Sequence, residues 1–462
     1  MAENRSGSPA GHADLQRRVA DLMPSLREDL ARLIAIPGIA SPGFPEEELF
    51  RAHDLVVELL REAGVEQIGD ITLEGKIAPV VTAEIPGPPG SPTVLMYTHY
   101  DVVPAGDEEL WGSPPFEATE RDGAIYGRGA SDSKANLIAI IGALRAWDCR
   151  PPVNLRLVFE GQEEFGSPFD FFPPTAPEHF AADAIVIADV GNVRPGVPTL
   201  SVGLRGDAAI TIEIRTLGAD KHSGQFGGAA PDALLTLIHA LATLHDENGD
   251  VAVEGLMRTP WTGASYTDEE FRGLAEMLPG MPYLGTGTLG ERIWTGAAIT
   301  VTGIDVPSVD EAVAAVQSYA RARLNVRVHP EQPALEAQDA VVAHLEAIKP
   351  FGIPLSVIRG DVGDGYAPRT DGSAYDAARA ALNKAWGAEA TYMANGGSIP
   401  LVRSLADAVP EAELLLFGAT DGYSNIHAPN ERVLLEEFER SVLVKAEFFR
   451  QLADRWGTKE DR

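Results

Sequence analysis

The sequence has very little cysteine and a shortage of basic residues. Cys149 is the only cysteine among 462 residues, which excludes an intrachain disulfide and fits a reducing compartment. Lys and Arg number 37 against 68 Asp and Glu, which gives a formal net charge of −31. Because this charge would repel nucleic-acid phosphates, nucleic acid is not expected as a partner.

Long apolar runs are also missing. No run of about 18 apolar residues occurs, so the sequence predicts no transmembrane helix and no membrane partner. The first residues, MAENRSGSPAGHAD, have no apolar core of the kind that a signal peptide needs. These absences predict a soluble cytoplasmic protein, with a polar, disordered tail at residues 1–13.

The residues that are present indicate an α/β protein with more than one domain. A length of 462 residues is about three times a typical domain of roughly 150 residues, which predicts two or three domains. Apolar residues recur at helical spacing over 14–35 and 46–64. Short apolar runs then alternate with helical stretches such as 133–147; the runs are VVTAEI, TVLMYTHYD, VNLRLVFEG, AIVIADV and LLLFGATD. This alternation predicts a sheet covered by helices on both faces.

The region from 206 to 328 has a different pattern. DAAITIEIRTL alternates apolar and polar residues, as a half-exposed strand does. PDALLTLIHALATLHDENG and VDEAVAAVQSYARARL are predicted as helices, and AAITVTGIDV and NVRVHP as strands. The pattern predicts a small α+β domain inserted into the larger one.

Residues that can bind metal ions lie where the predicted strands end. Five separate segments supply them, at His99 and Asp101, Asp132, Glu163 and Glu164, Asp189, and His427. Ligands of open α/β sheets bind beyond the carboxyl ends of the strands, so these side chains are expected at one edge of one sheet. Imidazoles and carboxylates together suit Zn²⁺, Mn²⁺ or Co²⁺, and the absence of cysteine from these segments argues against a structural zinc site.

Each of these signals has a plainer explanation when it is taken alone. A histidine at a strand end is more often structural, and Glu163 with Glu164 could be an ordinary acidic loop. Ser131 or Asp132 in GRGASDSK could simply cap a helix. This segment lacks the lysine-hydroxyl ending of a P-loop, which disfavours phosphate binding. The joint occurrence of the five segments is what favours a metal site.

Two other chemistries are excluded by their motifs. Gly285, Gly287 and Gly290 spell GxGxxG, but no strand precedes them and too few residues follow for the helix of a dinucleotide site. No GxSxG occurs, so the nucleophile elbow of a serine hydrolase is absent.

Eight ordered segments carry a family resemblance. From residue 98 to 431 they read THYDVVP, GRGASDSK, EGQEEFGS, VIADV, DKHSGQFGG, NVRVHP, GGSIP and HAPNE. The chain resembles the co-catalytic zinc peptidases, which include carnosinases, PepV-like dipeptidases, acetylornithine deacetylase and succinyl-diaminopimelate desuccinylase, and it is closest to the dipeptidases. The resemblance implies an α/β catalytic domain with a central mixed sheet at 1–205 and 329–462. It also implies an inserted α+β lid or dimerisation domain at 206–328, and a homodimer.

The resemblance implies two divalent metal ions, with zinc preferred to manganese or cobalt. His99, Asp132 and Asp189 would hold one ion. Asp132, Glu164 and His427 would hold the other, so that Asp132 bridges the pair through its two oxygens. Two such ions polarise a scissile carbonyl and lower the pKa of a shared water molecule.

Further roles follow from the same resemblance. Asp101 would accept the second N–H of the imidazole of His99, and Glu163 would be the general base for the metal-bridged water. His222 would stabilise the oxyanion, in dimeric members at the active site of the partner subunit. A substrate carboxylate would be bound by Arg327, Gly396, Gly397 and Ser398.

Asp189 bears on the substrate class. In the resembled family, Asp at this position is usual in dipeptidases, whereas deacylases and carboxypeptidases more often have Glu. Two departures leave the substrate open: Ala314 stands where carnosinase-like members have Asn, and Ala394-Asn395 where they often have Arg-Glu. The predicted function is metal-dependent hydrolysis of the amide bond of a dipeptide-like substrate. The alternatives are an N-acyl-amino-acid deacylase or specialised biosynthetic amidohydrolase, and a catalytically silent binding scaffold.

Overall fold

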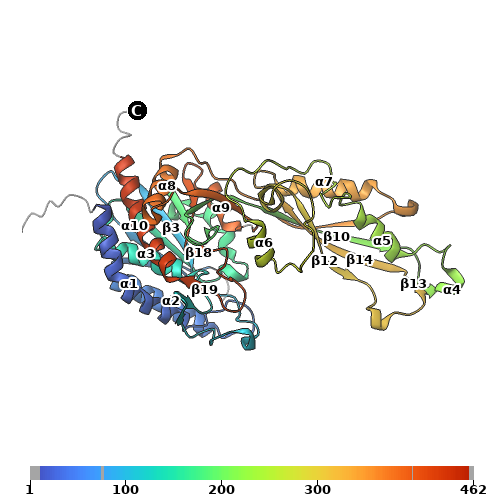
Figure 1. The fold of residues 1–462 in the computed structure, drawn as a ribbon, viewed down its shortest axis with the longest axis horizontal. Helices are drawn as coiled ribbons and strands as arrows, with labels where there is room; N and C mark the ends of the chain where they lie inside the picture. Colours follow the sequence, from blue (N-terminus) through green and yellow to red (C-terminus); the bar gives the residue numbers. More distant parts are fainter. Residues whose placement is uncertain (1–10, 74–77, 398, 457–462) are drawn as a thin grey trace, which may run out of the picture. The chain divides into compact units, whose positions relative to one another are not determined.

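The computed structural model divides into two compact units (Figure 1). It describes residues 11–73, 78–397 and 399–456. Unit 1 comprises residues 1–202, 368–393 and 404–462, and unit 2 comprises residues 203–367 and 394–403. No helix in the described part of the chain is long and apolar enough to span a bilayer.

The core of unit 1 is a mixed sheet of eight strands in the order β1-β2-β6-β3-β7-β17-β9-β16. The strands are β1 (Gln67–Ile71), β2 (Val80–Ile85), β6 (Asn154–Glu160), β3 (Thr93–His99), β7 (Ala184–Ile187), β17 (Glu413–Leu416), β9 (Thr199–Leu204) and β16 (Thr391–Asn395). β6, β3, β7 and β17 are parallel to one another, whereas β1 pairs antiparallel with β2, β2 with β6, and β9 with β17. The parallel strands are almost continuous apolar runs because both of their faces are buried. The five strands predicted from apolar runs are confirmed.

Helices pack around this sheet and against one another. They are α1 (His12–Ile34), α2 (Glu46–Glu62), α3 (Lys134–Ala146), α8 (Ser373–Trp386) and α10 (Leu435–Trp456). α3 is buried on nearly every side because α1, α10 and β3 all pack against it. The disordered tail predicted at 1–13 is too long, since residues 12 and 13 begin α1, whose Leu15 is fully buried. Residues 1–10 lie outside the described range.

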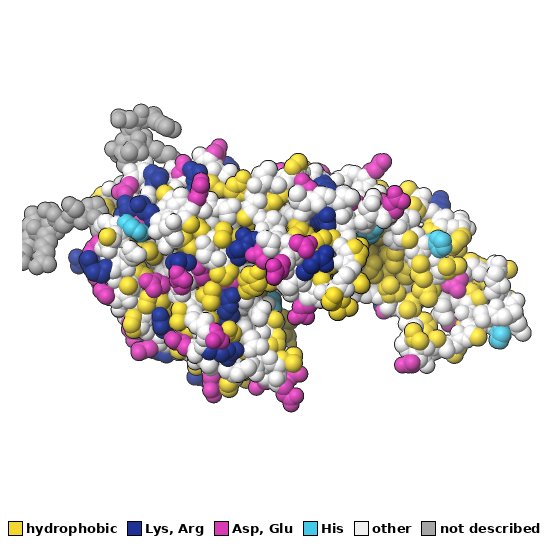
Figure 2. Space-filling view, in the orientation of Figure 1, with side chains coloured by type: hydrophobic (Ala, Val, Ile, Leu, Met, Phe, Trp, Pro, Cys, Tyr) yellow, Lys and Arg dark blue, Asp and Glu magenta, His cyan; other side chains and the backbone are white. Residues whose placement is uncertain are grey.

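Short strands in two further small sheets complete unit 1. They are β4 (Thr119–Arg121), β5 (Ala124–Tyr126), β8 (Gly191–Asn192), β18 (Thr420–Asp421) and β19 (Arg432–Leu434). β19 pairs with β5, which in turn pairs with β4, and β18 pairs with β8. α9 (Pro400–Ala408) spans a boundary between the units. Figure 2 shows acidic side chains interspersed with Lys and Arg over the visible face of unit 1, so this face carries no single acidic patch.

Unit 2 is an α+β unit with a four-stranded antiparallel sheet in the order β12-β14-β10-β15. Its main elements are β10 (Gly206–Arg215), β12 (Ala298–Asp305), β14 (Tyr319–Val328), β15 (Ser356–Gly363), α5 (Ala233–Ala242) and α7 (Ala334–Ala347). Every second residue of β10 and β14 is buried in one apolar cluster with α5 and α7, so both helices cover the same face of the sheet. The minor elements are β11 (Lys221–His222), α4 (Ser223–Phe226), α6 (Asp268–Leu274) and β13 (Ala315–Val316).

Unit 2 differs from the sequence prediction in two respects. The helix predicted for VDEAVAAVQSYARARL is wrong, because this stretch forms β13 and the first half of β14. Ala320, Ala322 and Leu324 are buried, whereas the residues between them are exposed, as in a strand. This alternation is hard to recognise in the sequence because alanine and arginine are strong helix formers. The insert predicted at 206–328 is also shorter than unit 2, which extends to residue 367 and includes 394–403. β15, at 356–363, pairs with β10 and completes the sheet.

Candidate metal centre

The structure brings the metal-capable side chains of unit 1 to the carboxyl edge of the parallel strands. β3 ends at His99, and Asp189 lies two residues after the end of β7. Glu164 belongs to the 3₁₀ helix η2 (Glu163–Phe165), which follows β6. Asp132 lies just before α3. Parallel strands place their carboxyl ends at one edge of a sheet, which explains why segments far apart in the sequence converge here.

The side chains form two groups that share one carboxylate. Nε2 of His99 lies 3.0 Å from Oδ1 of Asp132 and 3.1 Å from Oδ1 of Asp189. Nε2 of His427 lies 3.2 Å from Oδ2 of Asp132 and 3.0 Å from Oε2 of Glu164. In each group the ligand atoms lie within 4.8 Å of one another. Asp132 therefore offers one oxygen to each group, as a bridging ligand does.

This arrangement fits two divalent cations better than a set of hydrogen bonds. An imidazole nitrogen carries at most one hydrogen, yet each Nε2 has oxygens of two different carboxylates within 3.2 Å. Four ligands of a tetrahedral zinc ion are separated by roughly 3.3 Å when each lies about 2.0 Å from the metal. The observed separations are close to that value, so His99, Asp132 and Asp189 fit one ion, and Asp132 with His427 and Glu164 fits a second.

The pKa shifts of these side chains also indicate a site that favours the binding of positive charge. Hydrogen bonds to Asp132 and Glu164 raise the pKa of His427 to about 10. Burial raises the pKa of Glu164 to about 7, and burial likewise raises the pKa of Asp189. Several carboxylates thus share a poorly solvated space, where the charge of a divalent cation would favour their ionised forms.

Asp101 connects this centre to the segment that carries Glu163. Its Oδ1 lies 3.2 Å from Nδ1 of His99, and both side chains are fully buried. Its two carboxylate oxygens also accept the backbone N–H groups of Glu163 and Glu164, each at 3.1 Å. The family resemblance implies this contact with His99, and the role of Asp101 stays a prediction. No feature of the sequence indicated the two bonds to η2.

A second buried carboxylate, that of Glu431, was missed by the sequence analysis, although HAPNE contains it. Its oxygens accept the backbone N–H groups of Gly129, Ser131 and Asp132 at 2.8, 2.9 and 3.0 Å. Nη1 of Arg128 donates to the same carboxylate at 2.7 Å, and both side chains are 1% exposed. Glu431 therefore joins the loop of His427 to the loop of Asp132.

The residues with predicted substrate roles lie in unit 2. His222 is exposed on β11, where its Nδ1 accepts the backbone N–H of Gly224 at 3.1 Å. Arg327 is half-buried on β14. Gly396 and Gly397 follow β16 and are exposed, and Ser398 lies outside the described residues. The roles of these residues stay predictions.

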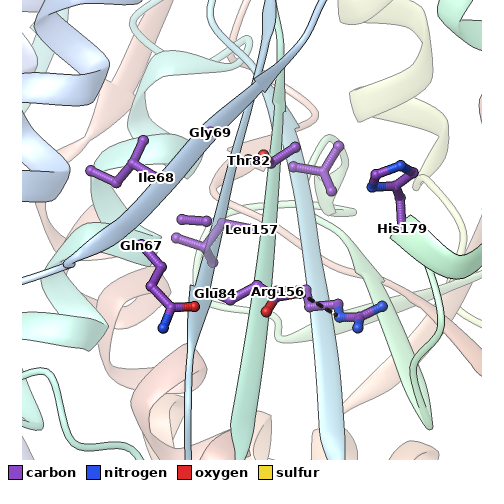
Figure 3. Close-up of a pocket in the computed structure, with 10 residues that line it drawn as sticks. Gln67, Ile68, Gly69, Thr82, Glu84, Arg156, Leu157 and His179 are labelled. Carbon is purple, nitrogen blue, oxygen red and sulfur yellow. Dashed lines mark ion pairs between the residues drawn. The ribbon is translucent and has the colours of Figure 1, made fainter.

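An open pocket elsewhere in unit 1 has a different character (Figure 3). It has a cavity volume of ≈290 Å³ and is lined by residues of β1, β2 and β6, with His179 beside them. Nε of Arg156 lies 3.4 Å from Oε1 of Glu84 across it. The described residues that line it include none of the metal-centre side chains. The metal centre is therefore the better candidate for chemistry.

Comparison with known proteins identifies relatives over most of the chain. The model of the family described as peptidase family M20/M25/M40 matches residues 95–451. A cysteinylglycine-S-conjugate dipeptidase from Corynebacterium striatum is 39% identical over 366 residues, which cover 78% of this chain and 80% of the relative. A Cys-Gly metallodipeptidase from Schizosaccharomyces pombe is 27% identical over 92% of this chain and 94% of its own. The solved structure of the dipeptidase Dug1p from Saccharomyces cerevisiae matches 97% of this chain and 99% of its own, with a TM-score of 0.77 at 23% identity.

Proposed function

The chain belongs to the peptidase family M20/M25/M40, and from this premise we propose that it is a metal-dependent dipeptidase. The observation that carries the proposal is the pair of three-residue ligand groups that share Asp132. Bound there, two divalent cations would polarise the scissile carbonyl and lower the pKa of the attacking water. Zinc is the proposed ion because imidazole and carboxylate donors suit it, with manganese or cobalt as alternatives.

In this proposal Glu163 is the general base. Burial, together with the charge of Asp189, raises the pKa of Glu163 well above its ordinary value in the metal-free chain. A carboxylate with a raised pKa takes a proton from water more readily than an ordinary one. Glu163 would then pass this proton to the leaving amine, which departs as a neutral group. Asp101 fixes the backbone from which Glu163 acts.

We propose that unit 2 acts as a lid and dimerisation unit. His222 would donate a hydrogen bond to the developing oxyanion, in a dimer at the active site of the partner subunit. A substrate carboxylate would be bound by Arg327, Gly396, Gly397 and Ser398.

A homodimer formed through unit 2 is part of the same proposal. β12 is an edge strand whose residues from 300 to 305 are exposed, and an exposed edge can pair with that of a second copy. Leu235 and Ile238 of α5 are 48% and 52% exposed. Figure 2 shows hydrophobic side chains gathered on the visible face of unit 2. Apolar surface of this kind is typical of an interface.

The proposed substrates are dipeptides of the cysteinylglycine type, with an apolar group on the N-terminal side chain. The relative that is 39% identical is named for cysteinylglycine S-conjugates. Two large apolar side chains are exposed beside metal ligands: Phe165, next to Glu164, is 47% exposed, and Ile426, next to His427, is 48% exposed. An extended apolar substituent would remove water from such side chains.

A cytoplasmic location also belongs to the proposal. Cys149 is the chain's only cysteine, and it is partly exposed as a free thiol. Disulfides are typical of secreted proteins, whereas cytosolic thiols stay reduced. Cell fractionation with an antibody against the chain tests the location directly.

Release of amino acids from a defined panel tests the function. Metal-stripped protein is assayed with Zn²⁺, Mn²⁺ or Co²⁺ restored, on Cys-Gly, S-benzyl-Cys-Gly and N-acetyl amino acids. Metal-dependent cleavage of the dipeptides is the expected result. Cleavage of the acylated compounds alone would identify a deacylase instead. Two bound metal ions without any turnover would favour a silent binding scaffold.

A further inference from the structure

Both carboxylate oxygens of Glu431 accept two hydrogen bonds each from residues 128–132. Oε1 accepts the N–H groups of Ser131 and Asp132, and Oε2 accepts the N–H of Gly129 and a guanidinium N–H of Arg128. A carboxylate has about four lone-pair positions for hydrogen bonds, and here each is directed at a donor. The side chain is fully buried, so water does not compete for these donors.

The same two loops are joined at further points. The backbone carbonyl of Glu431 accepts the N–H of Gly127 at 3.0 Å, and Oγ of Ser131 lies 3.1 Å from Oγ of Ser424. Between Ser424 and Glu431 the chain carries His427. The bonds of Glu431 therefore fix the loop of the bridging ligand Asp132 against the loop of a ligand of the second group.

The loop around His427 needs such support because its backbone is unfavourable. Asn425, His427 and Asn430 have positive φ angles of 53°, 62° and 61°. Residues other than glycine rarely adopt this left-handed region, and they stay there only when their surroundings hold them. Glu431 follows this segment directly and anchors its end in the protein interior.

We propose that Glu431 is a positioning residue that sets the affinity of the second metal site, an inference that rests on the proposed two-metal function. Asp132 and His427 both belong to the second ligand group, so a shift between their loops changes that group most. His99 and Asp189 lie at the ends of β3 and β7, which the sheet holds independently. Loss of the Glu431 carboxylate is expected to weaken the second site more than the first.

Glu431→Gln is a discriminating substitution. Glutamine has nearly the same volume, but its NH₂ group would face a backbone N–H in either orientation of the amide, because each carboxylate oxygen of Glu431 accepts at least one. In the variant, the NH₂ group of glutamine therefore faces at least one backbone N–H group, and two donors cannot form a hydrogen bond with each other. Burial of that mismatch is costly, so the loops are expected to move apart.

A matched control exists in the same unit. Asp29 is 6% exposed, and its Oδ2 accepts from Nη1 of Arg145 at 2.6 Å, which joins α1 to α3. Asp29→Asn removes a buried charge of the same kind without touching either ligand loop. Both variants are expected to lower the melting temperature, so a change in metal affinity separates positioning from general stability.

The experiment is a chelator competition with Zn²⁺ alone as the probe, on the full chain, with folding checked by circular dichroism. The expected result is that E431Q lowers the affinity of one of two zinc sites at least tenfold, while D29N keeps both at wild-type affinity. Two sites of unchanged affinity in E431Q, or an equal loss in D29N, would overturn the inference. If E431Q does not fold, Glu431→Asp replaces it, because aspartate keeps the charge on a side chain that is one methylene shorter. The same results are then expected, and the same results would overturn the inference. Wild-type protein that binds fewer than two zinc ions would contradict the proposed function itself.

Discussion

The carboxylate of Asp101 accepts the backbone N–H of Glu163 at 3.1 Å, although 62 residues separate them in the sequence. The same carboxylate lies 3.2 Å from Nδ1 of His99 and also accepts the N–H of Glu164. One buried side chain thus contacts an imidazole of the candidate metal centre and fixes the peptide that carries the proposed base. Disturbing Asp101 should affect metal binding and proton transfer together.

Asp101→Asn tests this double role. Asparagine has one acceptor oxygen, so at least one of the N–H donors of η2 would face an NH₂ group. We expect kcat/KM to fall about 10- to 100-fold, in the range seen when hydrogen-bond partners of metal ligands are lost. The matched control is Asp70→Asn, because Oδ1 of Asp70 also lies 3.1 Å from a histidine nitrogen, that of His53, but at the surface. Equal activity of the two variants would contradict the assignment.

Glu163→Gln and Glu164→Gln should separate the roles of two adjacent residues. Glutamine cannot accept the proton, so E163Q is expected to lower kcat about 10²- to 10⁴-fold and to keep two metal ions per chain. E164Q removes a charged ligand from the second group and should lower the metal content instead. Steady-state kinetics and elemental analysis of the same preparations check both outcomes. Normal turnover by E163Q would remove Glu163 from the base role.

Zinc binding should release protons at neutral pH. The pKa of His427 is raised to about 10 in the metal-free chain, so its imidazole is protonated at pH 7 and must lose a proton to bind a cation. Glu164, with a pKa of about 7, is partly protonated and adds to the release. Zinc affinity is therefore expected to increase as the pH rises from 6 to 8. Calorimetry in two buffers of different ionisation enthalpy measures the release, and identical heats in both buffers would contradict it.

Phe165→Ser should change the substrate preference. If the exposed ring contacts an apolar substituent, its loss is expected to lower kcat/KM for S-benzyl-Cys-Gly about tenfold relative to Cys-Gly. Phe50→Ser is the matched control, because Phe50 is 42% exposed on α2. The ratio of the two rate constants is the measurement. A ratio that stays at the wild-type value in F165S would leave the apolar preference without support.

Lys445→Met should stabilise the fold in a pH-dependent way. Burial lowers the pKa of Lys445 to about 7 from its ordinary value of 10.5. Between these values the unfolded chain binds more protons than the folded one, so wild-type stability rises with pH across this window. The charge is thus most costly below pH 7, where methionine should give its largest gain.

Urea unfolding at pH 6 and pH 9, with chelator present, measures the effect of Lys445→Met. The exposed Lys384 of α8 provides the control substitution Lys384→Met, for which no such pH dependence is expected. A gain of equal size at both pH values would show that the lysine charge is not the cause.

The convergence of the candidate metal ligands in unit 1 could be predicted because its signals are local. His99 ends one apolar run and Asp189 closely follows another, so the sequence itself places both residues at the carboxyl ends of strands. Because the strands are parallel, these ends lie at the same edge of the sheet. The role of Glu431 could not be predicted in this way. Its partners Gly129 to Asp132 are about 300 residues away, and only the conformation of two loops directs their N–H groups at it.

The error at β14 has a different physical origin. Alanine and arginine favour helices, and the stretch from 309 to 324 is rich in both. Pairing with β10 on one side and β12 on the other overrides that preference, because it buries Ala320, Ala322 and Leu324 beneath the helices of unit 2. A preference of the isolated segment cannot anticipate a partner such as β10, which lies more than 100 residues away in the sequence.

The order of strands in unit 1 bears on how the protein is made. β17, at 413–416, pairs with β7 on one side and β9 on the other, although both of those precede it by about 200 residues. While the chain is still emerging from the ribosome, the edges of β7 and β9 remain without this strand, and His427 has not yet been synthesised. Unpaired edges of this kind are prone to pair with other chains. The nascent enzyme therefore lacks a complete candidate metal centre, and the edges of β7 and β9 stay open to other chains, until residues 413–427 have been synthesised.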